Sequence, residues 1–498
     1  MVHRRQGDAG LKTTEGSAIR PEKKTSGIVE TFEGLFARTR PAFSQERIFS
    51  NARALAAAAL LNLGRQTVTG MLSAIGRQFE DWTSAYRLFS KERIDRAALF
   101  APAREAVVER LKPDEPMVVV MDDTLIRKRG RKIPGTAWKR DPLGPPFHTN
   151  FVWGQRFLQL SAALPDASTQ GCARGIPIDF LHAPSAAKPR KNASPEAWET
   201  YRKEQAELKV SAVAAKRLRE LRRQVSGKSI ICAVDGGFTN RTVFRNVPDD
   251  TVLIGRIRKD ASLFKAPEAE GAETSRRGRK RVYGDALPTP EEIRRDDSIP
   301  WQSVEAYAAG KVHTFDVKTI SAVRWRGTGN HDIRLVVVRP LAYRPRKGAK
   351  LLYRDPAYLI CTDAALPLES LLQAYLWRWE IELNFRDEKT VLGVGEAQIR
   401  KQPSVESVPS LVVASYACLL LAGTAADTGQ SVLPRQKWRP FKKTKRYSTQ
   451  DMISLFRTQL WRIGLKKNLT HFASDTSTNA NMDFLQNSLH SAVMFAQK

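Results

Sequence analysis

The fold of this chain is indicated first by residues 117–124, which read Met-Val-Val-Val-Met-Asp-Asp-Thr. Five consecutive apolar residues fit a central β-strand that is covered on both faces. A second run of this kind, residues 229–237, reads Ser-Ile-Ile-Cys-Ala-Val-Asp-Gly-Gly. The first run leads into Asp122 and Asp123, and the second leads into Asp235. Two buried strands that both end in acids are therefore the basis for predicting the core and its chemistry.

The segments around these two strands predict a complete α/β core. Residues 151–164 and 175–181 read as two further strands, residues 195–225 as a long charged helix, and residues 251–257 as a last strand. This order is the one that a ribonuclease H-like core requires, because a helical crossover lets the first and fourth strands lie side by side and parallel. Asp122 and Asp235 then emerge at neighbouring strand ends, where open α/β sheets bind their ligands.

The segments before and after this core have different residue patterns. Residues 43–113 contain short helices separated by Gly turns, with Arg65 and Arg77 nearby, which suits either a helix-turn-helix-like DNA-binding unit or a plain helical bundle. Residues 258–367 alternate like strands between Pro- and Gly-rich loops, which predicts a β-rich insertion or, as the alternative, a separate small β domain.

The predicted fold class is α/β, with a ribonuclease H-like mixed sheet, a β-rich insertion, a helical N-terminal DNA-binding domain and a helical C-terminal region. The predicted units are a flexible basic arm at 1–42, the helical DNA-binding domain at 43–113, the first part of the core at 114–257, the insertion at 258–367, the second part of the core with a helix carrying the catalytic Glu at 368–430, and the C-terminal helical region at 431–498.

Composition limits the function classes. Lys and Arg number 81 against 52 Asp and Glu, and the net charge of +29 indicates a polyanion as partner. No run of about 18 uncharged apolar residues occurs, which argues against a membrane protein. Four cysteines without a C-x-x-C pair predict reduced thiols in a cytoplasmic protein. The absence of a G-x-x-x-x-G-K-[ST] motif leaves an ATP-driven motor unsupported.

Residues 368–390 predict one helix, since they contain no Gly or Pro. At 100° per residue, five polar side chains share a stripe about 80° wide. They are Tyr375, Arg378, Glu382, Arg386 and Lys389. A single carboxylate framed by cations and a phenol suits a helix that holds a metal ligand against a phosphate backbone. The alternative is a solvated helix with ordinary i,i+4 ion pairs.

Three carboxylates, Asp122, Asp235 and Glu382, are the candidate catalytic and metal-binding residues. Hard oxygen ligands of this kind suit Mg²⁺ or Mn²⁺. Two such ions about 4 Å apart activate a nucleophile on one side of a phosphodiester and stabilise the leaving oxygen on the other. The pattern Asp-x-Thr favours Asp122 over Asp123, which strand alternation sends to the opposite face. Glu380 points about 200° away from Glu382, so Glu380→Ala is predicted to leave cleavage nearly unchanged.

The spacing Tyr375-x2-Arg378-x3-Glu382-x6-Lys389 resembles the Y-R-E-K signature of DDE transposases of the insertion-sequence-four type. The resemblance covers residues 115–400 and includes the two upstream Asp residues. It implies a cut-and-paste transposase that cleaves and transfers DNA strands with two Mg²⁺ or Mn²⁺ ions per active site. It also implies that Tyr375, Arg378 and Lys389 contact DNA phosphates, and Arg386 matches a basic position of the same group.

The resemblance also implies the partners: double-stranded DNA, as inverted-repeat transposon ends and as target, and a second copy of the chain in a homodimeric synaptic complex. The implied location is the bacterial cytoplasm, in association with the nucleoid. The alternative function is a domesticated, non-catalytic DNA-binding protein derived from a transposase. A third possibility, a structure-specific nuclease, leaves the Y-R-E-K stripe unexplained.

Three smaller features belong to this interpretation. Basic runs at 127–132 and 276–281 are predicted to meet the DNA, where each Lys or Arg replaces a condensed counterion. Trp301 and Trp325 are candidates for an aromatic residue that some relatives use to grip a flipped base. For both, packing in the hydrophobic core is the simpler interpretation.

Overall fold

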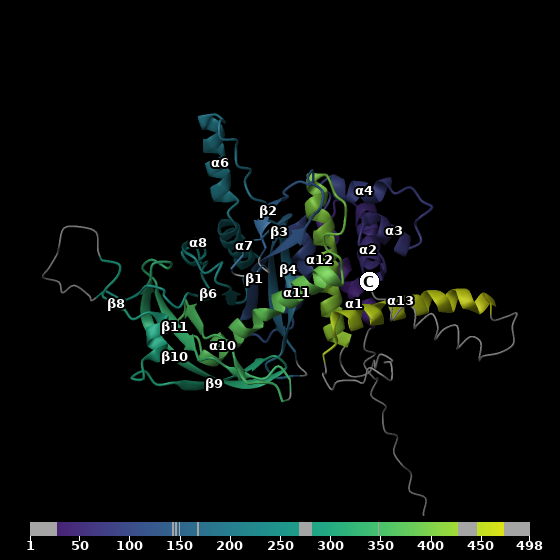
Figure 1. The fold of residues 1–498 in the computed structure, drawn as a ribbon. Coiled ribbons are helices and arrows are strands. Elements are labelled where there is room, and N and C mark those ends of the chain that lie inside the picture. The colour runs from purple at the N-terminus through teal and green to yellow at the C-terminus, as the bar shows by residue number, and fades with distance from the viewer. Residues whose placement is uncertain are drawn as a thin grey trace, which may run out of the picture.

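The computed structural model describes residues 27–141, 144, 147–148, 150–166, 169–267, 281–346, 348–426 and 446–472. It is a mixed α/β structure built around one large sheet (Figure 1). Residues 1–26 of the predicted arm (1–42) and residues 276–280 of the second basic run (276–281) lie outside these residues.

Five strands of the sheet have the order along the chain predicted from the sequence, and the first and the fourth are parallel neighbours, as predicted. They are β1 (Met117–Arg127), β3 (Phe151–Pro165), β4 (Ala173–His182), β5 (Ile230–Val234) and β6 (Thr251–Arg256). β3 pairs antiparallel with β1 and β4, whereas β5 runs parallel to both β1 and β6. The crossover from β4 to β5 consists of two helices, α6 (Pro195–Glu207) and α7 (Val210–Gln224), where the sequence predicted one.

The region after β6 extends this sheet and does not form a separate one. β14 (Ala357–Cys361) pairs antiparallel with β6, and the order continues through β11 (Asp332–Val338) and β10 (Lys311–Trp325). Shorter strands in this region are β7 (Leu263–Lys265), β8 (Ala286–Leu287) and β9 (Gln302–Ala308), which belong to the large sheet, and β12 (Ala342–Tyr343) and β13 (Leu352–Tyr353), which form a two-stranded sheet of their own. Near the other edge of the large sheet, β2 (Ala137–Arg140) pairs with β3. Pairing with β14 satisfies the edge of β6, which would otherwise expose unpaired backbone groups.

The first part of the chain is helical. Its elements are α1 (Ile28–Ala37), the short 3₁₀ helix η1 (Arg40–Ala42), α2 (Glu46–Leu61), α3 (Val68–Ala74), α4 (Thr83–Ser90) and α5 (Arg96–Val108). The prediction of a flexible arm up to residue 42 is wrong for α1. Ile28, Phe32 and Phe36 are fully buried at helical spacing, and Phe32 packs edge-on against Phe456 with the ring centroids 5.0 Å apart. The polar residues around α1 hid this apolar face in the sequence.

Helix α12 (Gln402–Ala426) connects the two halves of the molecule. It contacts β4 on one side and helices α1, α2, α4 and α5 on the other (Figure 1). It is long and apolar enough to cross a membrane, but 89% of its apolar window is buried inside the structure, as expected of a core helix. The last described helix, α13 (Thr449–Phe472), packs against α1, α2 and α12. The four cysteines are free and buried.

Candidate active site

The sheet brings Asp122 and Asp235 to neighbouring positions. The parallel pairing of β1 and β5 ends at the partners Met121 and Val234, and each acid is the next residue along its strand. β5 ends there, whereas β1 continues to Arg127 paired with β3, so Asp122 lies within a strand and not at its end. Asp235 begins a tight turn in which its Oδ1 accepts hydrogen bonds from the N–H groups of Gly237 (2.9 Å) and Phe238 (3.1 Å).

The doubled acid has two different environments. Oδ2 of Asp123 lies 3.1 Å from Nε of Arg156 on β3, whereas Oδ2 of Asp122 lies 3.8 Å from Nη1 of Arg378. Adjacent residues of a strand point to opposite faces, so only one acid can face the helix that covers this side of β1. Val120, on the same face as Asp122, packs with Ile381 and Phe385 of that helix. These contacts favour Asp122 as the first acid of the site.

The stripe of polar residues comes from two helices, where the sequence predicted one. α10 (Leu368–Trp377) ends at Arg378, and α11 (Trp379–Thr390) begins immediately after it. At the junction the N–H of Arg378 bonds to the carbonyl of Tyr375, three residues back, which tightens the turn. Nη1 of Arg378 lies 3.8 Å from Asp122 and 3.9 Å from Oε1 of Glu382. The junction therefore places one cation between two of the three predicted carboxylates.

The carboxylates repel one another in a partly buried place. Burial, followed by the charge of Asp235, raises the pKa of Asp122 to about 8, and the charges of Asp123 and Glu382 act in the same direction. The N–H of Asp123, 2.8 Å from Oδ1 of Asp122, opposes this rise. Because a carboxyl group titrates this high only where its charged form is disfavoured, the cluster needs more positive charge than Arg378 supplies.

The predicted DNA-binding residues do not all have the same surroundings. The guanidinium carbon of Arg378 lies 5.9 Å from the ring centroid of Tyr375, a cation–π contact. Burial lowers the pKa of Lys389, and the charges of Glu388, Glu382 and Asp122 oppose this effect, which places its ammonium group in the field of the site. Arg386 pairs instead with the adjacent Asp387 at 2.8 Å, and its side chain is 63% exposed. Arg386 is therefore set apart from the carboxylates.

The donor chemistry of the site fits a divalent cation, although the carboxylates do not enclose one. Within the described part of the chain, no group of three or more His, Cys, Asp or Glu residues is arranged to hold a metal ion. The guanidinium of Arg378 occupies the space between Asp122 and Glu382. Three hard oxygen side chains and the unmet need for positive charge nevertheless match what Mg²⁺ or Mn²⁺ requires.

Only part of the first basic run is available to a ligand. Arg127, Arg129, Arg131 and Lys132 are exposed, and Arg127 pairs with Asp141 at 2.8 Å. Lys128 instead donates to the carbonyl of Gly395, and burial lowers its pKa to about 8. Lys128 therefore has a structural role, which corrects the prediction that every cation of this run faces DNA.

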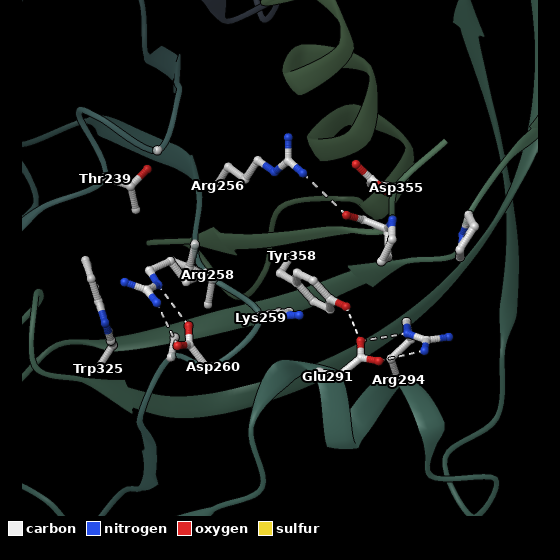
Figure 2. A pocket seen from close by; sticks show the side chains of 15 residues that line it. Thr239, Arg256, Arg258, Lys259, Asp260, Glu291, Arg294, Trp325, Asp355 and Tyr358 are labelled. Atoms are coloured by element: carbon white, nitrogen blue, oxygen red, sulfur yellow. Dashed lines mark hydrogen bonds and ion pairs between the residues drawn. The ribbon is translucent and has the colours of Figure 1, made fainter. Parts of the chain in front are cut away.

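A basic cavity of about 1120 Å³ opens beyond Asp235, at the end of β6 (Figure 2). Arg256, Arg258, Lys259 and Arg294 line it, and Arg258 and Arg294 are held by Asp260 and Glu291, respectively. Trp325 lines it as well and packs perpendicular to Phe244 at 5.6 Å. Trp301 lies elsewhere, between Lys318 (4.5 Å) and Arg339 (5.5 Å), in a structural position.

Sequence reasoning missed the polar contacts on the far side of α11. Oε2 of Glu380 lies 2.6 Å from Nη2 of Arg446, and Nη1 of the same arginine donates to the carbonyl of Ala173 at 2.8 Å. Seven residues along α11, Oδ2 of Asp387 accepts a hydrogen bond from Thr449 at 2.6 Å. Glu380 does face away from the carboxylates, as predicted, but it holds the segment that leads into α13. The signal in the sequence was a pair of acids at i and i+7, which places both on one face of the helix.

Glu388 is a buried acid of α11 whose titration can be tested. It is 2% exposed, and its Oε1 has no hydrogen-bond partner among the described residues. Burial raises its pKa to about 8, while Gln159 and Lys389 oppose the rise. In the unfolded chain the pKa of a Glu side chain is about 4.3. Between this pH and about 8, Glu388 is therefore protonated in the native state and ionised in the unfolded state. The contribution of Glu388 to stability therefore falls as pH rises through this window.

We expect Glu388→Gln to remove this pH dependence. The difference in unfolding midpoint, variant minus parent, should increase as the pH is raised from 5 to 8. In free energy of unfolding, this increase should be at most a few kcal/mol, because each pKa unit corresponds to about 1.4 kcal/mol. Thermal unfolding of both proteins at several pH values measures the difference. A difference that stays constant with pH would show that Glu388 is not held neutral.

Comparison with known proteins places this geometry in a family context. A family model described as "DDE superfamily endonuclease" matches residues 39–331, more than half of the chain. The match includes Asp122 and Asp235 and ends before Glu382. A search of curated proteins found no match.

Proposed function

Since the chain belongs to the family of DDE superfamily endonucleases, we propose that it is a DNA transposase of the insertion-sequence-four type, which cleaves and transfers DNA strands. The observation that carries the proposal is the convergence of Asp122, Asp235 and Glu382. Asp122 lies within β1, Asp235 directly follows the parallel strand β5, and Glu382 comes from a helix packed on β1. The strand order of a ribonuclease H-like core and the Y-R-E-K spacing support the same conclusion.

In this proposal the three carboxylates hold two Mg²⁺ or Mn²⁺ ions. Bound there, the ions would activate the attacking oxygen and stabilise the leaving oxygen of a phosphodiester. Arg378 partly neutralises Asp122 and Glu382 in the free protein. An incoming phosphate offers its guanidinium a bidentate partner, so that the same side chain binds the scissile strand and releases the two acids.

The remaining residues form a path for the DNA backbone. Lys389 lies in the electrostatic field of the carboxylates, and the exposed cations of residues 127–132, with Arg256 and Lys259 of the cavity beyond Asp235, would extend the contact with the DNA backbone. Arg386 contributes as an exposed cation beside Asp387 and not as part of the carboxylate cluster. The proposed substrates are the inverted-repeat ends and a target duplex, held by two copies of the chain. The non-catalytic alternative is not favoured, because the three acids are all present.

Cleavage should require Mg²⁺ or Mn²⁺. The purified protein is incubated with a duplex that carries the inverted repeats flanking its gene, and the products are separated on a denaturing gel. We expect nicks at the repeat end with Mg²⁺ or Mn²⁺ and little product with Ca²⁺, whose larger and looser shell positions the reacting oxygens poorly. The double variant Asp122→Asn/Asp235→Asn is the control for a contaminating nuclease. Cleavage that survives excess chelator would refute the mechanism.

A further inference from the structure

A second basic surface lies on the N-terminal helices, on elements that contribute nothing to the carboxylate cluster. α2, the turn after α3, and α4 enclose a cavity of about 550 Å³ (Figure 1 shows these helices together). Four arginines line it, which we call the arginine cradle: Arg47, Arg77, Arg87 and Arg93. The rest of its wall consists of one acid, Asp81, of two apolar residues, Ile48 and Leu88, and of the neutral polar residues Gln45, Ser50, Asn51, Thr83 and Ser84. Side chains of these types commonly contact DNA phosphates.

The arginines of this region divide into paired and unpaired groups. Arg38, Arg40 and Arg53, outside the cradle, each form an ion pair, with Glu105 and Glu109, with Glu46, and with Glu33, respectively. By contrast, within the described residues Arg47, Arg87 and Arg93 have no carboxylate within ion-pairing distance. The acids of these ion pairs thus neutralise other arginines and leave three of the four cradle arginines, Arg47, Arg87 and Arg93, available to a ligand.

The acid in the cradle wall, Asp81, and the adjacent Glu80 are both engaged by other groups. Glu80 pairs with Arg77 at 2.6 Å, and Arg77 also donates to Asn51 at 3.0 Å. Oδ1 of Asp81 accepts hydrogen bonds from the N–H (2.9 Å) and the hydroxyl (2.6 Å) of Thr83, at the start of α4. The cradle is therefore a net positive concavity, which favours an extended anion over an acidic side chain of its own chain.

An exposed aromatic residue, Phe79, lies in the chain between Arg77 and Asp81, which both line the cradle. Phe79 is 92% exposed, although large apolar side chains are usually at least half buried in a folded chain. The turn that carries it is fixed, because the indole N–H of Trp82 donates to the carbonyl of Arg77 at 2.7 Å. Gly76 closes α3 just before it with a φ of +76°, which favours glycine. The ring is thus held out into solvent beside Arg77 by a closed turn.

We infer that the arginine cradle binds the phosphate backbone of a DNA duplex and that Phe79 packs against a base step in the adjacent groove. Apolar side chains that project from a cationic surface are used in this way by proteins that bend or grip DNA. Rim cations supply affinity that depends on salt, and an apolar wedge supplies affinity that does not. This inference rests on the proposed function only in taking DNA as the substrate, and it adds a grip that is separate from the catalytic site.

The salt dependence of binding tests the cradle directly. The full-length protein is titrated with a fluorescent duplex of about 30 base pairs of arbitrary sequence, between 50 and 200 mM salt. Each phosphate contact contributes about 0.9 to the slope of log K against log salt. The triple variant Arg47→Gln/Arg87→Gln/Arg93→Gln should reduce that slope by about 2 to 3. The matched control Arg38→Gln/Arg40→Gln/Arg53→Gln removes the same charge from paired arginines and should change it by less than about 1.

Phe79 gives a second, independent readout. Phe79→Ala should weaken binding several-fold at every salt concentration with the slope unchanged, and Phe79→Trp should retain the parent affinity. The proposed role of the cradle would be refuted if the parent and the cradle triple variant had equal slopes, or if both triple variants reduced the slope equally. The proposed role of Phe79 would be refuted if Phe79→Ala bound DNA with the affinity of the parent. Thermal unfolding confirms that each variant is folded.

The outcome is separable from that of the proposed function. The slope is measured without metal and without cleavage. If the protein fails to cleave DNA but shows the predicted slopes, the proposed transposase activity is refuted, whereas the proposed DNA binding by the cradle is supported. A parent protein that binds DNA with an almost flat salt dependence refutes both the cradle and the assignment of the +29 charge to nucleic acid.

Discussion

Glu382→Gln is expected to abolish DNA strand cleavage, by about 10³-fold or more, while binding of the same DNA persists. Glutamine has the shape of glutamate but lacks the charge that a divalent cation requires, so the change removes a ligand without opening a cavity. Arg378 and Lys389 remain available to phosphate, and the loss of one negative charge beside them should leave binding equal or slightly tighter. Gel-based cleavage and anisotropy-based binding with one end duplex measure both quantities.

Two further variants test whether the loss of cleavage is specific to Glu382. Glu369→Gln, at an exposed position in the first turn of α10, removes the same charge near the same helices and should cleave like the parent. Arg378→Ala should weaken binding and slow cleavage together, because Arg378 bridges Asp122 and Glu382 and is placed to meet the scissile strand. Equal loss in Glu382→Gln and Glu369→Gln would point to a general effect of charge or folding and would remove Glu382 from the catalytic set.

Arg446→Ala should destabilise the protein by about 2 to 4 kcal/mol, because it leaves the carboxylate of Glu380 without its partner. The two groups are 27% and 15% exposed, so the loss should lie near or just below that for a fully buried pair. Arg446 also donates to the carbonyl of Ala173, which the variant leaves unpaired. We expect the thermal midpoint to fall by several degrees, and cleavage to fall with it, since Glu380 lies on the helix that carries Glu382.

The double variant Glu380→Gln/Arg446→Ala should recover part of this loss, because no charge is then left without a partner. Arg38→Ala, which breaks ion pairs to the exposed acids Glu105 and Glu109, serves as the control and should cost no more than about 1 kcal/mol. A small effect of Arg446→Ala would show that the contact does not hold the C-terminal segment. The sequence predicted that Glu380→Ala would leave cleavage nearly unchanged. Because this variant removes the same ion pair, we expect it to lose stability as well.

The sequence located most of the candidate site because its strongest signals are local. An unbroken apolar run such as residues 117–121 is stable only as a strand covered on both faces, and Asp122 follows it directly. The helix period placed Glu382 and Arg378 on one face, and in the structure they are 3.9 Å apart. Arg386 had the same predicted phase, but its pairing with Asp387 depends on the charge next to it, which periodicity does not describe.

The sequence by itself determined the five core strands with their order along the chain, the parallel pairing of the first and the fourth, the acids that follow their apolar runs, and the excess of positive charge. Each of these follows from short-range pattern or composition. Only the tertiary structure decided that β14 joins β6 in one sheet, that α1 is buried against α12, and that Arg378 separates two helices. It also decided that Glu380 meets Arg446 and that Arg47, Arg77, Arg87 and Arg93 line one cavity. The reason is that such pairings join residues far apart in the chain, where the position of each group is set by packing and not by its neighbours in sequence.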